Sequence, residues 1–486
     1  MVWGGYYIKE MSEQSLKDKT VKGVIWSSVE RFSVQGVQFL VMLVIARLLD
    51  PKDFGLVGML AIFLAVAQSL IDSGFSQALI RKQNRTDVDN STVFYFNIIV
   101  STILYLILYA IAPWVAGFYN ELQLCSLMRV LCLIIIINSF TVVQRALYTA
   151  FINFKTQAKA SFIAALVSGI VGVWMAYNGY GVWTLVWQQL LNAGINALFL
   201  WVYSNWYPRW VYSWKSFSQL FSFGSKLLAS GLLDTLYTNI YLLVIGKIFN
   251  AASLGYYTQA DRFVKLPSSN TTGILQRVTY PVLCSIQDDD NRLREDYRKL
   301  LRLSAFIIFP LMCLLAGIAY PLVDLLLGEK WRFAATLIIP LSFTMMWYPI
   351  HAINLNLLQV KGRSDLFLRL EIIKKTIGVT VLVMSIPFGL LFMCYAGIVT
   401  SIICLVINTY YTGKLIQVGF LMQMKDLMGI LISSLIVFAV SFLISYYVTS
   451  YLLCVILACI VSAALFALLS YLFNRDEMKY LISFIK

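Results

Sequence analysis

A polar segment at residues 252–284 carries the side chains best suited to bind an anion in an otherwise apolar sequence. Arg262 and Lys265 are three residues apart, so a helix would place both on one face. The planar guanidinium of arginine can hold a phosphate through two parallel hydrogen bonds, and lysine adds a point charge. Asp261 precedes Lys265 by four residues and could instead pair with it. The spacing therefore predicts a cation-lined cavity or an internal ion pair, and the two are compatible.

Ionisable residues also interrupt other apolar runs. A charge at the centre of a bilayer costs about 2.5–3.5 kcal/mol on insertion scales, so such residues usually face a cavity or a partner. The cations predicted to contact an anionic substrate are Arg31, Arg145, Lys226, Arg262, Lys265 and Arg277. The carboxylates that could exchange a proton or Na+ are Glu30, Asp234 and Asp261. In the rival interpretations, Arg145 contacts lipid headgroups, Lys226 extends to the membrane surface, and the carboxylates only neutralise basic neighbours.

Other polar residues have simpler interpretations. The sequence has one histidine, His351, and its polar neighbours make a core residue with satisfied hydrogen bonds a better prediction than a cavity-lining group. Lys374 and Lys375 are expected to extend toward the inner membrane surface. The eight cysteines lie mostly inside apolar runs and form no pair or cluster with the histidine. This pattern argues against a zinc or haem site, so no metal and no cofactor beyond a coupling ion is expected.

The elements that must position these residues are membrane-spanning helices. Of the 486 residues, 60% are hydrophobic and 13% are charged, and the mean hydropathy is +0.77. A water-soluble core cannot bury so much apolar surface, which excludes a soluble enzyme, a disordered chain and a secreted disulfide scaffold. The net charge of +14 arises from basic residues concentrated in alternate short loops, as the positive-inside rule predicts. We therefore expect membrane lipids rather than nucleic acid around the chain, and both termini in the cytoplasm.

The predicted fold is an all-α polytopic membrane protein with about 14 transmembrane helices. A spanning helix needs about 20 mostly apolar residues. The apolar runs that meet this length are 22–47, 54–79, 92–117, 123–150, 157–177, 181–203, 218–247, 252–284, 301–327, 333–359, 366–387, 391–413, 428–448 and 451–473. The longest polar break is the charged segment 287–299, and the aromatic segment 206–214 suits the headgroup layer.

An internal repeat suggests how these helices are organised. Residues 43–50 resemble residues 243–250, and Gly55 matches Gly255 at the same spacing of 200. We therefore predict two pseudo-symmetric six-helix lobes around a central cavity, plus two C-terminal helices. The expected parts are a cytoplasmic tail (1–21), an N-lobe (22–203), an interfacial linker (204–217), a C-lobe (218–413), an amphipathic linker (414–427) and the last two spans with a cytoplasmic tail (428–486).

Several short motifs resemble a known transporter family. They are Gly23-Val-Ile-Trp-Ser-Ser28, Ile45-Ala-Arg-Leu-Leu-Asp-Pro51, Asp53-Phe-Gly55, Gly74-Phe-Ser-Gln-Ala-Leu-Ile80, Gln144, Phe154-Lys155 and Gly181-Val-Trp183. The chain is similar to the polysaccharide-transport branch of the multidrug/oligosaccharidyl-lipid/polysaccharide (MOP) flippase superfamily, the Wzx-type flippases. The resemblance covers the first twelve expected spans, is densest over residues 20–85, and identifies a fold more sharply than a cargo.

The resemblance implies a two-lobed body of fourteen spans with a cationic cavity in the bacterial inner membrane. It implies flipping of an undecaprenyl-pyrophosphate-linked oligosaccharide from the cytoplasmic to the periplasmic leaflet, for O-antigen, capsule or exopolysaccharide assembly. A polysaccharide polymerase and its chain-length machinery would be partners. The first rival function is a drug or cation exporter of the same fold, which would favour an acidic cavity. The second, a membrane polysaccharide polymerase or ligase, needs a large outer loop, and none is expected here.

Overall fold

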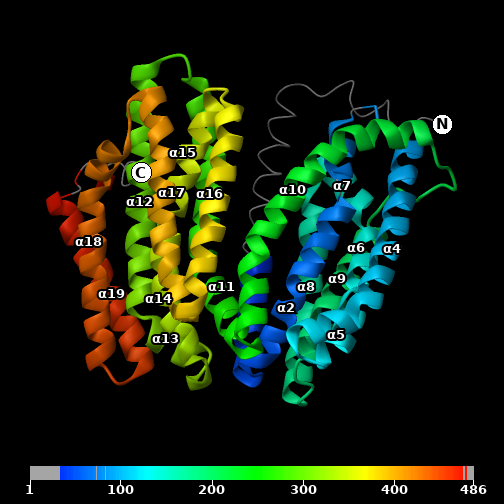
Figure 1. The fold of residues 1–486 in the computed structure, drawn as a ribbon, viewed down its shortest axis with the longest axis horizontal. Helices are drawn as coiled ribbons and strands as arrows, with labels where there is room; N and C mark the ends of the chain where they lie inside the picture. Colours follow the sequence, from blue (N-terminus) through cyan, green and yellow to red (C-terminus); the bar gives the residue numbers. More distant parts are fainter. Residues whose placement is uncertain (1–32, 73, 83, 474, 476, 479–486) are drawn as a thin grey trace. The chain divides into compact units, whose positions relative to one another are not determined.

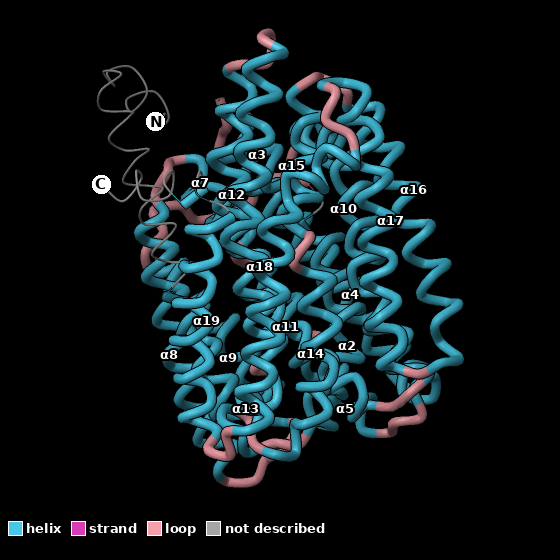
Figure 2. Tube along the Cα trace, turned by 90° about the vertical axis from the view of Figure 1, so that its left-hand side faces the viewer, coloured by secondary structure: helices cyan, strands magenta, loops and turns pink. Residues whose placement is uncertain are grey.

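The computed structural model describes residues 33–72, 74–82, 84–473, 475, 477 and 478. Throughout this part of the chain the regular elements are helices, joined mostly by short loops and without any strand (Figure 2). The predicted all-α fold class is therefore confirmed. The chain divides into two compact units, Met1–Gly255 and Tyr256–Lys486.

The first unit begins with the helix Ser33–Leu48. Its further helices are α2 (Pro51–Asp72), α3 (Phe75–Arg81), α4 (Asp87–Tyr119), α5 (Gln123–Leu131), α6 (Leu133–Ser139), α7 (Val142–Ala150), α8 (Phe154–Tyr177), α9 (Trp183–Val202), α10 (Trp214–Ile248) and the first residues of α11 (Ala251–Ser285). A buried cluster around Phe75, Phe94, Val143 and Leu220 joins α3, α4, α7 and α10. Apolar burial thus holds one end of this unit together.

The second unit contains the rest of α11 and the helices that follow. These are α12 (Asp290–Gly317), α13 (Ala319–Leu326), η1 (Glu329–Trp331), α14 (Arg332–Met345), α15 (Tyr348–Val360), α16 (Ser364–Ser385), η2 (Ile386–Phe388), α17 (Leu390–Ile416), α18 (Phe420–Tyr447) and α19 (Tyr451–Phe473). α12 packs along α18, and α17 packs against α14, α15 and α16.

Ten helical segments in the described part of the chain are long and apolar enough to cross a membrane. The number rises to eleven if the bent pair Gln123–Ser139 and Val142–Ala150 counts as one span. Three other expected spans correspond to the helix Ser33–Leu48, α11 and α16. The first is short in its described part, and α11 and α16 carry many polar or charged residues. The chain is thus a multi-pass membrane protein, while the count of fourteen remains a prediction.

α10 belongs to the first compact unit, although the sequence analysis placed it in the second lobe. In Figure 1 it crosses the ends of α4 and α7 before it descends beside α2, and it packs on α2, α3 and α4. Phe217 stacks within this corner, with its ring centroid 5.9 Å from that of Phe75. The boundary between the compact units therefore falls after Gly255, because α10 packs on the helices of the first unit. The sequence repeat had instead suggested a boundary before residue 218.

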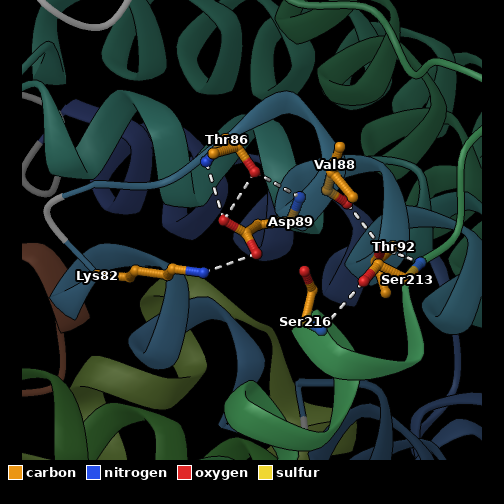
Figure 3. A network of polar contacts seen from close by, with 7 residues as sticks. All are labelled: Lys82, Thr86, Val88, Asp89, Thr92, Ser213 and Ser216. Carbon is orange, nitrogen blue, oxygen red and sulfur yellow. Dashed lines mark hydrogen bonds and ion pairs between the residues drawn. The ribbon is translucent and has the colours of Figure 1, made fainter.

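The aromatic segment before α10 is fastened to the start of α4 (Figure 3). The backbone N–H of Arg209 donates to Ser91 Oγ at 3.0 Å, and that of Ser213 donates to Thr92 Oγ1 at 3.1 Å. Buried Asp89 closes the capping box of α4 and accepts a hydrogen bond from Lys82 at 2.7 Å. Trp210, which lies in this hydrogen-bonded segment, is 93% exposed. Such a side chain suits the headgroup layer, and membrane contact of this segment remains a prediction.

The two matched segments of the internal repeat touch each other at their glycines. A Cβ atom at Gly55 would collide with the carbonyl of Ala251, and one at Gly255 would collide with the carbonyl of Pro51. Ala251 is the repeat counterpart of Pro51 at the spacing of 200, so the two close contacts are reciprocal. The glycines are therefore required because the backbones of α2 and α11 approach too closely for any side chain.

Replacing Gly255 by alanine is expected to destabilise the protein by about 1–3 kcal/mol, because the added methyl forces these backbones apart. Thermal unfolding of the purified protein in detergent would measure the loss. Gly117→Ala is the matched control, because no heavy atom lies within 4 Å of its Cβ position. Equal melting temperatures for the two variants would contradict the close contact.

Two helices begin earlier than the sequence predicted. α12 begins at Asp290, so most of the expected loop 287–299 is helical, and the Asp289 side chain caps it by accepting from the Arg292 N–H at 3.1 Å. α18 begins at Phe420, so only residues 417–419 separate it from α17. Arg298 and Asp426 join these added turns through two hydrogen bonds of 2.7 and 2.6 Å. This tertiary contact explains why polar sequence is helical there.

Candidate functional site

The predicted pairing on α11 is present. Lys265 Nζ lies 2.7 Å from Asp261 Oδ2, and the two side chains are 44% and 18% exposed. Arg262 is exposed and makes no hydrogen bond or ion pair with any side chain that the structure describes. The two cations of this face therefore differ: Asp261 forms an ion pair with Lys265, whereas it interacts with Arg262 only electrostatically, and no described side chain occupies the hydrogen-bond donors of the Arg262 guanidinium.

The hydroxyl groups of α11 make hydrogen bonds within the helix and to a neighbouring helix. Pro267 lies inside the helix and has no N–H to donate to the preceding turn. Ser269 Oγ donates to the carbonyl of Lys265 at 2.6 Å, and Ser268 Oγ donates to the carbonyl of Met345 on α14 at 2.8 Å. The second bond anchors α11 in its unit just after the charged turn, which fixes where Arg262 emerges.

Arg145 lies on α7 in the first unit and donates a hydrogen bond to a neutral amide. Its Nη2 donates to Asn196 Oδ1 on α9 at 3.0 Å. Asn196 in turn donates from Nδ2 to Ser161 Oγ on α8 at 3.1 Å. α7 is bent by 41° from the preceding helical segment Gln123–Ser139. The Arg145 side chain therefore leaves the helix in another direction than it would if the two segments formed one straight span. Its side chain is exposed at the surface of the unit.

A second group of polar residues lies near Arg145, and the sequence analysis did not select it. Asp72 on α2 interacts electrostatically with Arg145 and accepts a hydrogen bond from Gln68 Nε2 at 3.2 Å. Gln68 Oε1 accepts from Asn138 Nδ2 on α6 at 2.9 Å. The available signal in the sequence was the presence of polar residues inside several apolar runs. Arg145 therefore belongs to a polar network that draws on five helices.

The structure describes only some of the other candidate residues from the sequence. Arg31 and Glu30 lie outside the described residues, and the side chains of Lys226 and Arg277 also fall outside the description. Asp234 is exposed on α10 in the first unit. Among the described candidates, Asp261 and Lys265 are therefore in direct contact, whereas Arg145 and Asp234 belong to the other unit. None of the described residues forms a group of three or more histidine, cysteine or acidic side chains that could hold a metal ion.

The second unit contains a further ion pair that the sequence analysis missed. Lys374 Nζ lies 2.5 Å from Glu371 Oε1 on α16, and the lysine side chain is only 13% exposed. The ion pair shows that the carboxylate one turn away is a partner of Lys374, and the extension of this lysine toward a membrane surface stays a prediction. His351 is bonded at both ring nitrogens, to Ser401 Oγ at 3.0 Å and to Asn408 Nδ2 at 3.1 Å. Its assignment as a satisfied core residue is confirmed.

Comparison with known proteins identifies the relatives of this arrangement. A family model described as "Polysaccharide biosynthesis protein" matches residues 44–336. The teichuronic acid biosynthesis protein TuaB of Bacillus subtilis is 25% identical over 354 residues, which cover 72% of this chain and 73% of that protein. The lipopolysaccharide biosynthesis protein WzxC of Escherichia coli is 24% identical over 373 residues, covering 76% of each chain.

Solved structures show the same architecture. The lipid II flippase MurJ in an inward closed conformation superposes with a TM-score of 0.77 and 14% identity, covering 93% of this chain and 100% of that chain. At this identity the likeness establishes the fold alone.

Proposed function

Because the chain belongs to the polysaccharide biosynthesis protein family, we propose that it flips an undecaprenyl-pyrophosphate-linked oligosaccharide across the membrane by alternating access. The cargo moves from the cytoplasmic to the periplasmic or outer leaflet and supplies a surface polysaccharide such as O-antigen, capsule or exopolysaccharide. The protein is a transporter rather than an enzyme. The observation that carries the proposal is the exposed side chain of Arg262 on a membrane helix, which makes no hydrogen bond or ion pair with the described residues and has only an electrostatic interaction with Asp261. A guanidinium can hold a phosphate group of a pyrophosphate through two parallel hydrogen bonds.

The other candidate cations are proposed as further contacts of the pyrophosphate. Arg145 offers a second guanidinium, oriented by Asn196. Lys265 is held by Asp261 until a stronger anion competes for it. Arg31, Lys226 and Arg277 complete the proposed set of pyrophosphate contacts. Because Asp261 forms an ion pair with the neighbouring Lys265, it is the leading coupling carboxylate for a gradient of H+ or Na+, with Glu30 and Asp234 as the others.

The proposed setting is the bacterial inner membrane, with both termini in the cytoplasm. The concentration of basic residues in alternate loops supports this orientation. A polysaccharide polymerase and its chain-length machinery would receive the flipped lipid on the far side. The charge of the described candidate residues favours this cargo over the rival, a drug or cation exporter, because cationic drugs bind to acidic rather than basic cavities.

Deletion of the gene tests the proposal. The mutant is expected to lose its surface polysaccharide and to accumulate undecaprenyl-linked repeat units on the cytoplasmic face, measured by lipid extraction and mass spectrometry. Restoration by the wild-type gene is the control. Normal surface polysaccharide together with altered drug tolerance would reject the flippase and support the exporter.

A further inference from the structure

Two asparagines on α9 make parallel contacts with α8. Asn192 donates from Nδ2 to Ser168 Oγ at 3.1 Å, and Asn196 donates from Nδ2 to Ser161 Oγ at 3.1 Å. They lie one helical turn apart, so they share a face of α9. Only Asn196 also accepts a hydrogen bond from Arg145, with Nη2 and Oδ1 separated by 3.0 Å. The asparagines therefore share a packing role, and Asn196 has an additional partner.

The additional contact restrains the direction of a charged group. Asn196 is only 6% exposed, and its amide is held on the opposite side by Ser161. An arginine side chain has several rotatable bonds, and a free one loses conformational entropy whenever it binds a ligand. Because a guanidinium offers its donors in one plane, fixing one edge also fixes the direction of the others. An arginine that is oriented in advance binds a phosphate with less entropic cost.

We propose that Asn196, supported by Ser161, is a positioning residue that orients Arg145 for the anionic headgroup of the transported lipid. This inference rests on the proposed function, in which Arg145 contacts the pyrophosphate. Asn196 acts through Arg145 and does not touch the substrate. It follows that its contribution to binding disappears when Arg145 is absent, whereas its contribution to helix packing does not.

Binding of undecaprenyl pyrophosphate to the purified full chain in lipid nanodiscs tests the proposal. Asn196→Leu is expected to weaken binding up to about tenfold, because the substrate must then order the Arg145 side chain itself. Asn192→Leu is the matched control, because it removes the same helix contact without reaching Arg145, and its affinity should stay within about twofold. Ser161→Ala is a milder variant, because it retains the Asn196 side chain but removes the hydroxyl that supports its amide. It should also weaken binding, by a smaller factor than Asn196→Leu.

A double-mutant cycle separates positioning from packing. In an Arg145→Ala background, adding Asn196→Leu should cause no further loss of affinity, although it should still lower the melting temperature. An equal loss in both backgrounds, or unchanged binding by Asn196→Leu alone, would overturn the role of Asn196. Normal binding by Arg145→Ala would remove Arg145 from the site. A wild-type protein that binds no undecaprenyl pyrophosphate would instead reject the proposed function itself.

Discussion

Replacing Arg262 by alanine is expected to lower transport about 10- to 100-fold while the protein folds and reaches the membrane at its normal level. The side chain is exposed and has no hydrogen bond or ion pair among the described residues, so folding loses little when it is removed. The pyrophosphate would lose up to two charge-assisted hydrogen bonds. Complementation of the deletion strain measures transport, and immunoblotting of membranes measures the protein level.

Arg292→Ala is the matched control for this variant. Arg292 is also an exposed arginine of the second unit, but it pairs loosely with Asp296 at 4.0 Å in the segment that opens α12. Its removal changes the net charge by the same amount and should leave transport normal. Full complementation by Arg262→Ala would reject the assignment of Arg262 as the headgroup contact of α11, because the other described cation of this helix, Lys265, is already paired with Asp261.

The chemistry of α11 was predictable from the sequence because it depends on local spacing. Side chains three and four residues apart share a helix face, so both the common face of Arg262 and Lys265 and the pairing of Lys265 with Asp261 follow from the sequence. The spacing could not show which cation the carboxylate neutralises most directly. That outcome depends on side-chain geometry, and it divides the two cations into a paired and an exposed one.

The surroundings of Arg145 were not predictable in the same way. Its partner Asn196 lies 51 residues away, and Asn138 lies 70 residues from its partner Gln68. A single sequence does not show which distant helices meet. A polar residue in an apolar run indicates that some partner exists, because an unpaired polar group in lipid is costly. It does not identify that partner.

The helices themselves followed from hydropathy, whereas several of their ends did not. Apolar runs predict where a helix crosses a membrane, but α12 and α18 extend beyond their apolar parts. Arg298 and Asp426 stabilise these extensions across the two helices, and the pair is separated by 128 residues in sequence. The sequence repeat matched Gly55 on α2 with Gly255 on α11. The structure shows that the backbones of these two helices touch at the matched glycines.

Replacing Gln423 by leucine is expected to cause the largest loss of stability among the variants considered. Gln423 is fully buried, and its amide exchanges two hydrogen bonds of 3.1 Å with the amide of Asn354 on α15. Its Nε2 also lies 3.1 Å from the carbonyl of Val418. Leucine fills a similar volume but leaves these groups unpaired, at about 1–3 kcal/mol for each buried polar group. Thermal unfolding in detergent should therefore show a larger decrease than for Gly255→Ala.

Ser434→Ala on the same helix separates this network from ordinary helix packing. Ser434 is equally buried, but its hydroxyl donates only to the carbonyl of Ile430 in its own helix, at 2.8 Å. Because no second helix depends on that bond, the variant should stay close to the wild-type melting temperature. A similar small change for Gln423→Leu would show that α18 is held by apolar contact and by the Arg298–Asp426 pair alone. A large decrease confined to Gln423→Leu would instead show that the buried amide pair fixes α18 to α15, since leucine preserves the apolar contact.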